Sequence, residues 1–277
     1  TATGKKLALH PERAFGPLLG AQYTITRGTL KLTAQMPPLG PADTRTAELQ
    51  VRLRAGRWDT LAVAELEPDA WILPFRVDGF EARRDVPYRI VYDLRTGPET
   101  TERFEYEGVL RAEPADGEVV LAALTCVKHF TGGIRWNHEA VWFPHADLAR
   151  AVASHDPDLL FFSGDQVYEG DITGAERRPT ETAMLDYLDK WYRWVWSFRD
   201  LTRDRPTITI PDDHDVYHGN LWGAGGRAAE RQDDGGYTMP PEFVRMVERT
   251  QTSHLPDPYD PTPVEQGIGV YYTSVEW

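Results

Sequence analysis

Carboxylate, imidazole, thiol and phenol side chains gather just after three apolar segments of this sequence. Cys126 follows the first segment, Asp165 and Tyr168 follow the second, and the stretch Pro211–Asp215, with the sequence PDDHD, follows the third. Asp165 would offer a carboxylate that can bridge hard cations. The PDDHD stretch packs three carboxylates and an imidazole, and its acidic groups repel one another unless a cation neutralises them. Together these residue types predict a metal site.

Each of these features also has a simpler structural interpretation. A Gly-Asp pair after a strand, as at Asp165, is a common turn or helix cap. Cys126 could be a small core residue, Tyr168 an aromatic side chain packed at the base of a loop, and the PDDHD stretch a solvated acidic turn. In favour of a metal, a thiolate beside carboxylates suits iron or zinc better than magnesium alone, and a strong cation can hold a phenol as phenolate.

The apolar segments that precede these residues have the pattern of parallel strands. They are Val119–Leu124, Leu159–Ser163 and Thr207–Ile210. A helix near residues 146–154 and a longer amphipathic helix that carries three tryptophans separate them, which is a βαβ pattern. Ligands of such sheets collect beyond the carboxyl ends of the strands. All the polar groups above would then lie at one edge of one sheet.

The first part of the chain has a two-residue periodicity instead. Its alternating segments are Thr29–Gln35, Ala47–Leu53, Thr60–Ala64, Trp71–Val77 and Tyr88–Tyr92. No helical pattern of useful length interrupts them, which favours an antiparallel β-sandwich of immunoglobulin-like or fibronectin-like type. We expect residues 1–115 to form this sandwich domain and residues 118–277 to form a second domain with a parallel sheet core, in an α+β or α/β fold.

Composition limits the classes of partner. The 277 residues include 43 acidic and 30 basic side chains, for a formal net charge of −13. This charge opposes binding to nucleic acid or anionic lipid, and the apolar runs fall well short of the roughly 18 residues that a membrane span needs. Thr1–Lys6 lacks the apolar core of a signal peptide. A single cysteine excludes an intrachain disulfide.

The combination of motifs resembles the PhoD-like alkaline phosphatases of the calcineurin-like metallophosphoesterase superfamily. Cys126, the GDQVY stretch Gly164–Tyr168 and the DDHDV stretch Asp212–Val216 look like three site motifs of that family. The amino-terminal sandwich is also similar to the family's leading domain. The resemblance implies an αββα-type metallophosphoesterase domain and a periplasmic or secreted location. It further implies hydrolysis of small phosphomonoesters or phosphodiesters by a hydroxide that two metal ions activate.

The resemblance also implies roles for individual residues. Cys126, Asp165, Tyr168 and Asp213 would hold the metals, with Asp165 as the bridging carboxylate and Tyr168 as a phenolate ligand to ferric iron. His214 would contact the phosphate and assist the leaving group. The implied cofactors are Fe3+ and a divalent ion, Ca2+ first, with Zn2+, Mn2+ and Mg2+ as alternatives.

Later motifs of the superfamily are missing from this chain. The superfamily completes its site with further histidines, often in a Gly-His-x-His element, but only His218 and His254 follow His214 here. His254 has the pattern of a helix exit after a predicted helix at Pro241–Thr252. We therefore expect the second domain to be incomplete at its carboxyl end, with a longer protein or a second chain completing the site. The alternative hypothesis is a non-catalytic binding or structural module.

Overall fold

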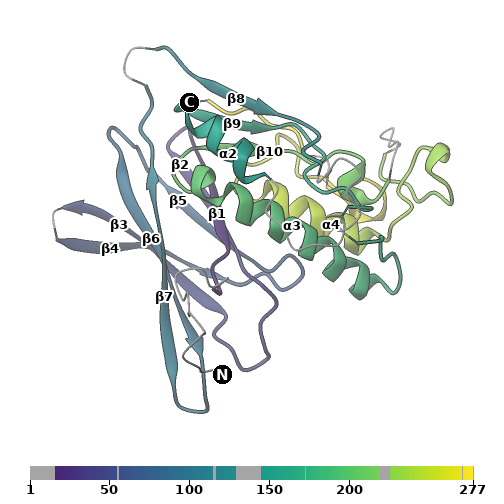
Figure 1. Cartoon of the computed structure of the whole chain (residues 1–277), viewed down its shortest axis with the longest axis horizontal. Helices are drawn as coiled ribbons and strands as arrows, with labels where there is room; N and C mark the ends of the chain where they lie inside the picture. The colour runs from purple at the N-terminus through teal and green to yellow at the C-terminus, as the bar shows by residue number, and fades with distance from the viewer. Residues whose placement is uncertain are drawn as a thin grey trace, which may run out of the picture.

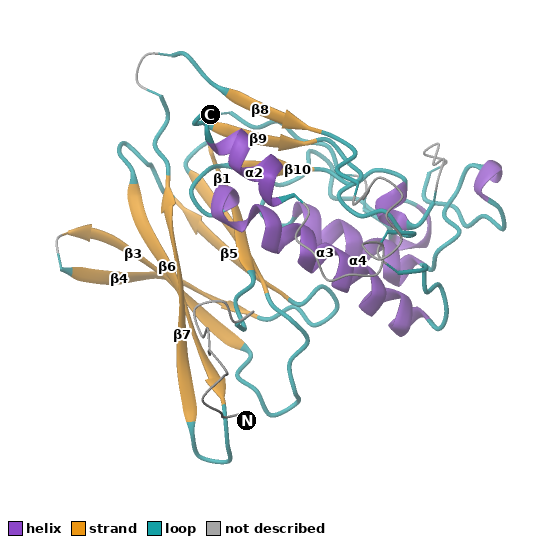
Figure 2. Cartoon of the chain, in the orientation of Figure 1, coloured by secondary structure: helices purple, strands orange, loops and turns teal. Residues whose placement is uncertain are grey.

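The computed structural model describes residues 16–54, 56–114, 117–128, 145–171, 173–218, 225–269 and 271–276. Figures 1 and 2 show a β-sandwich on one side and a layer of parallel strands and helices on the other. The predicted fold class, an antiparallel sandwich followed by a parallel sheet with helices, is confirmed. Thr1–Lys6 lies outside the described residues. The domain boundary between 115 and 118 stays a prediction.

Two antiparallel sheets pack face to face in the sandwich. One has the strand order β1–β2–β5 and the other β4–β3–β6–β7. The strands are β1 (Gly20–Thr26), β2 (Thr29–Gln35), β3 (Thr46–Arg54), β4 (Arg57–Glu65), β5 (Ile72–Asp78), β6 (Val86–Arg95) and β7 (Thr101–Leu110). Alternate side chains of a strand point to the same face, and the inward-facing set includes the fully buried Leu32, Leu49 and Ile90.

A parallel sheet with the order β10–β9–β8 follows in the sequence. The elements are β8 (Leu121–Leu124), α2 (Ala146–Ala153), β9 (Leu159–Phe162), α3 (Thr180–Thr202), β10 (Thr207–Thr209) and α4 (Pro241–Thr252), with short 3-10 turns η2 (His214–Val216), η3 (Gln232–Asp234) and η4 (Glu265–Gly267). Helix α3 packs on the sheet through Trp194 and Phe198, whose ring centres lie 4.8 and 5.1 Å from that of Phe162. These aromatic contacts are part of the core. No helix within the described ranges is long and apolar enough to cross a membrane.

Strand β8 is partly exposed, although the apolar run Val119–Leu124 has the composition of a buried strand. Leu121 is 52% exposed, and Val119 and Val120 are exposed to a similar extent just before the strand begins. Within the described part of the chain, β8 is an edge strand that pairs with β9 alone. A central strand has a neighbouring strand on both sides, whereas an edge strand has one on a single side. An apolar run in an edge strand is therefore not always buried.

The sandwich and the parallel layer meet through polar side chains of the sheet β1–β2–β5. The hydroxyl of Thr24 donates to the carbonyl oxygen of His254 at 2.6 Å, and Nε1 of Trp191 donates to Oε1 of Gln35 at 2.8 Å. Gln22 lies on the same face, and all three of these strand residues are buried. Because hydrogen bonds are directional, they fix how the two layers dock.

We expect His254 to make the protein sensitive to acid. The imidazole is fully buried, and its Nε2 donates to the carbonyl oxygen of Thr207 at 2.9 Å. Burial lowers the pKa of His254 to about 3, and the nearby charge of Lys31 acts in the same direction. The unfolded chain takes up a proton near pH 6.5 and the folded chain does not, so stability is lost as the pH falls from about 6.5 toward 3.

The variant His254→Gln removes the titrating group and keeps an amide that can donate to Thr207. Between about pH 7 and pH 4.5, the free energy of unfolding in urea should fall by roughly 2–3 kcal/mol more in the wild type than in this variant. His155→Gln changes an exposed histidine and should behave like the wild type. The same pH dependence in wild type and His254→Gln would contradict the expectation.

Candidate metal centre

The predicted site residues lie together at the carboxyl edge of the parallel sheet. Cys126 follows β8, Asp165 and Tyr168 follow β9, and Asp213 and His214 follow β10. Parallel strands end at the same edge of a sheet. The topology therefore brings these side chains into one region, as the sequence predicted.

Two of the loops at this edge hold a residue in a strained backbone conformation. Cys126 and Asp165 have φ angles of 52° and 56°. This left-handed region costs an ordinary L-residue about 1–3 kcal/mol, and the strain persists only where the surroundings enforce it. Strained residues of this kind cluster at functional sites.

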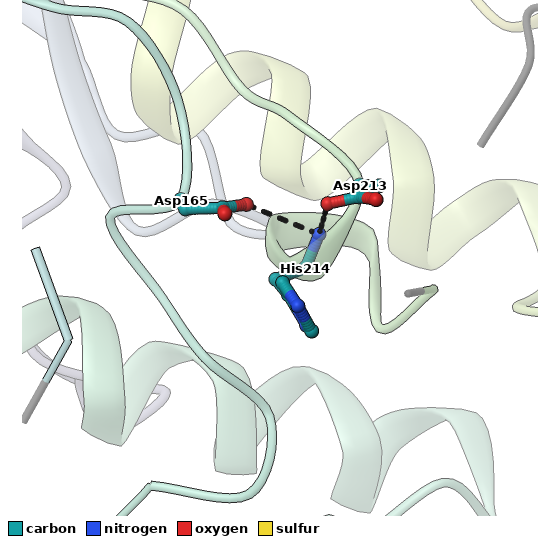
Figure 3. Close-up of side chains that lie close together, drawn as sticks. All are labelled: Asp165, Asp213 and His214. Atoms are coloured by element: carbon teal, nitrogen blue, oxygen red, sulfur yellow. Dashed lines mark hydrogen bonds between the residues drawn. The ribbon is translucent and has the colours of Figure 1, made fainter. Parts of the chain in front are cut away.

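Asp165, Asp213 and His214 form a group that could hold a metal ion. Each offers one ligand atom, and these atoms lie within 4.8 Å of one another. Figure 3 shows the two carboxylates turned toward the backbone amide of His214, which donates to Oδ1 of Asp213 at 2.7 Å and to Oδ1 of Asp165 at 3.3 Å. Asp165 is buried and the other two are half-buried. Cys126 is not a member of this group.

Cys126 and Tyr168 both donate to one oxygen of Asp165. The Sγ of Cys126 lies 3.4 Å, and the hydroxyl of Tyr168 2.9 Å, from Oδ2 of Asp165. Burial raises the pKa of Tyr168 well above its usual range, and the hydrogen bonds with Cys126 and Asp165 raise it further, so the phenol keeps its proton in this arrangement. A cation bound to the carboxylate of Asp165 could replace the thiol proton of Cys126 and the phenol proton of Tyr168, which both point at it. Carboxylate, imidazole, thiol and phenol donors together fit iron or zinc.

Glu169 holds the imidazole of His214. Its Oε2 lies 2.7 Å from Nδ1 of His214, and its Oε1 accepts from Arg177 at 3.5 Å. Burial lowers the pKa of His214, but the hydrogen bond and charge of Glu169, with the charges of Asp165 and Asp213, outweigh it and raise the pKa overall. Glu169 was not among the predicted site residues. Its sequence signal was an acidic residue directly after the predicted phenolate ligand.

Lys128 brings a positive charge to the same edge. It is exposed, and its Nζ lies 4.8 Å from the centre of the Tyr168 ring. An ammonium group at this place can attract an anionic group of a substrate. Lys128 was also not predicted, because a lysine two residues after a cysteine is an ordinary surface pattern.

The loop that precedes Asp165 requires a glycine at position 164. The φ angle of Gly164 is 107°, and a Cβ at this position would lie 2.4 Å from the Cβ of Asp212. Gly164→Ala should therefore lower the free energy of unfolding by about 3 kcal/mol or more, since backbone strain and a steric clash add together. Denaturant unfolding measures the loss.

Gly79→Ala is the matched control for this prediction. Gly79 has a φ angle of 73°, but an added Cβ would meet no atom within 4 Å, so the control carries backbone strain of about 1 kcal/mol without a clash. Equal losses in the two variants would show that the close contact with Asp212 does not matter.

Comparison with known proteins finds a structural likeness at low sequence identity. No family model matches the chain, and no curated protein matches it. Among solved structures, the chain is similar to a purple acid phosphatase from the seeds of yellow lupin (Lupinus luteus), with 14% sequence identity and a TM-score of 0.47. The match covers 79% of this chain and 38% of that one. The chain thus spans well under half the length of the lupin protein.

Proposed function

We propose that this protein is a metal-dependent hydrolase of phosphate esters, of the PhoD-like metallophosphoesterase kind. The observation that carries the proposal is the convergence of two carboxylates and an imidazole, from Asp165, Asp213 and His214, at one edge of the parallel sheet, where one potential ligand atom of each lies within 4.8 Å of the others. The GDQVY and DDHDV motifs, which resemble the PhoD-like family, contain all three residues. The proposed substrate is a small phosphomonoester or phosphodiester.

The proposed metal ligands are Asp165 and Asp213, with Cys126 and Tyr168 joining them once their protons are lost. A bound metal pair would activate a water molecule as the nucleophile and neutralise charge on the phosphate. We propose ferric iron with a divalent ion, calcium first, as the family resemblance implies. Zinc, manganese and magnesium are the alternatives, and the thiol and phenol donors favour iron or zinc over magnesium alone.

His214 is the proposed proton donor to the leaving group. Its Nδ1 is held by Glu169 at 2.7 Å, which leaves Nε2 for the substrate and orients the ring. The side chain is 31% exposed, so a substrate can reach it. Imidazole is suited to general acid catalysis near neutral pH. We further propose that the ammonium group of Lys128 attracts the phosphate.

Metal content and hydrolysis of two test esters check the proposal. The purified protein would be analysed by elemental mass spectrometry and visible spectroscopy, then assayed with p-nitrophenyl phosphate and bis(p-nitrophenyl) phosphate before and after chelation. We expect about two metal ions per chain, an iron–phenolate absorption band, and hydrolysis of at least one ester that chelation abolishes. Absence of both metal and hydrolysis in the full natural protein would overturn the proposal.

A non-catalytic binding module is the second candidate, and one observation favours it. The carboxylate of Asp165 already accepts hydrogen bonds from the Cys126 thiol, the Tyr168 phenol and the His214 amide, so a cation is not needed to satisfy it. On this hypothesis the sandwich recognises a cell-surface or carbohydrate partner. The protein would then bind no metal tightly and hydrolyse neither ester in the experiment above.

A further inference from the structure

The carboxylate of Asp215 connects the two loops that carry the proposed metal ligands. It is fully buried, and its Oδ2 accepts from the backbone amides of Asp165 at 2.8 Å and Asp212 at 2.9 Å. Its Oδ1 accepts from the amide of Val167 at 2.9 Å. One side chain therefore holds the loop after β9 and the loop after β10. The bond to Asp165 acts directly on the residue with the left-handed backbone.

Gln251 connects the same carboxylate to helix α4. Its Nε2 donates to Oδ1 of Asp215 at 2.8 Å, and its Oε1 accepts from Nε2 of Gln166 at 2.8 Å. The Nε2 also donates to the hydroxyl of Tyr187 on α3 at 3.1 Å, and the backbone carbonyl accepts from the hydroxyl of Thr209. Gln251 is fully buried. Its amide thus reaches the loop after β9, the loop after β10 and a second helix.

The carboxylate of Asp215 is fully satisfied by hydrogen bonds. Asp215 accepts four hydrogen bonds, and every partner is a donor. A buried carboxylate is tolerated only when it is satisfied in this way. Helix α4 is a regular helix packed into the core, so the network anchors the two loops to a rigid element. A site of defined geometry needs such support.

We propose that Gln251 and Asp215 are positioning residues, which hold Asp165 and Asp213 in a fixed place relative to helix α4. The inference rests on the proposed function, because it assigns these residues a part in the same metal site. They act through the ligand loops and do not touch the reacting atoms. Removal of such supporting contacts typically weakens metal affinity or activity by about 10- to 100-fold.

The test compares two buried glutamines that are changed in the same way. Gln251→Met keeps the length of the side chain and removes its hydrogen bonds. The matched control is Gln35→Met, since Gln35 is also buried and bonds to Trp191 and to the carbonyl of Ala70 in the sandwich interface. Both variants should lose stability. In calorimetric titration with Zn2+, Gln251→Met should bind about 10- to 100-fold more weakly than wild type, whereas Gln35→Met should bind like wild type.

Amide hydrogen exchange supplies a readout that requires neither metal nor activity. The amides of Asp165 and Val167 are bonded to Asp215, so they should be protected in the wild type and in Gln35→Met. In Gln251→Met they should exchange faster than in the control. Tyr187→Phe removes only the hydroxyl that accepts from Gln251, and this milder variant should shift the same amides in the same direction if Gln251→Met fails to fold.

The two readouts separate failure of this inference from failure of the proposed function. Unchanged protection at Asp165 and Val167 in Gln251→Met or Tyr187→Phe would overturn the positioning role even in an active hydrolase. Reduced protection in a protein that binds no Zn2+ and hydrolyses no ester would overturn the proposed function and leave the positioning role supported.

Discussion

Replacing Asp165 by asparagine should slow ester hydrolysis by about 1,000-fold or more, because metal ions supply several kcal/mol of transition-state stabilisation. Asparagine keeps the size of the side chain but removes its charge, and it replaces one acceptor oxygen with an amide NH2 group, which is a hydrogen-bond donor. That group would meet the Cys126 thiol and the Tyr168 phenol, which both donate to Oδ2 of Asp165. Loss of a ligand and the clash of donors act in the same direction.

Elemental analysis and initial rates check this prediction together. In Asp165→Asn, the metal content per chain should fall along with kcat. Asp204→Asn is the control, because Asp204 is a half-buried aspartate that accepts from the amide of Val109 at 3.0 Å, away from the candidate site. The control should lose some stability and retain metal and turnover. Unchanged turnover in Asp165→Asn would remove the metallohydrolase assignment.

His214→Gln should slow the hydrolysis of alkyl phosphates far more than that of p-nitrophenyl phosphate. Proton donation to the leaving group contributes about 100- to 10,000-fold, and it matters most when the departing alkoxide is strongly basic. The p-nitrophenolate ion leaves without a proton, so its release should be slowed much less. Glutamine can still bond to Glu169, which holds the imidazole at 2.7 Å in the wild type, so the loop should keep its shape.

The ratio of kcat values for the two substrates is the measurement. Wild type and the exposed-histidine control His155→Gln should show the same ratio, and His214→Gln a larger preference for p-nitrophenyl phosphate. An equal loss on both substrates would mean that His214 binds the phosphate and does not transfer a proton.

The fold could be predicted where side chains follow the periodicity of their element. β2 and α4 have the predicted bounds, Thr29–Gln35 and Pro241–Thr252. β7 was not predicted, because four of the ten residues of Thr101–Leu110 are charged and only Phe104 and Tyr106 give it an apolar alternation. β1 alternates as well, but Gly20 and the turn residues before it have the pattern of a loop, which hides the start of the strand. The polar face of β1 is buried against a second layer. No local sequence pattern predicts such burial, because it depends on the tertiary structure.

That the residues of the candidate site lie together could be predicted, because they follow a local rule in which polar groups stand directly after parallel strands. The support of the site could not be predicted in this way. Gln251 is 36 positions from Asp215, and a glutamine near the end of an amphipathic helix has nothing unusual about it. Similarly, the bond between Glu169 and His214 depends on how two loops approach one another.

The polar face of the sheet β1–β2–β5 affects how readily the sandwich could be separated from the parallel layer and combined with another domain. Thr24 and Gln35 form hydrogen bonds across this boundary, and water can replace bonds of this kind when the layers separate. A sandwich without its neighbour would present many hydroxyl and amide groups there in place of a wide apolar patch that promotes aggregation. The boundary is therefore one at which recombination could exchange the sandwich, because its own face there carries mostly hydroxyl and amide side chains.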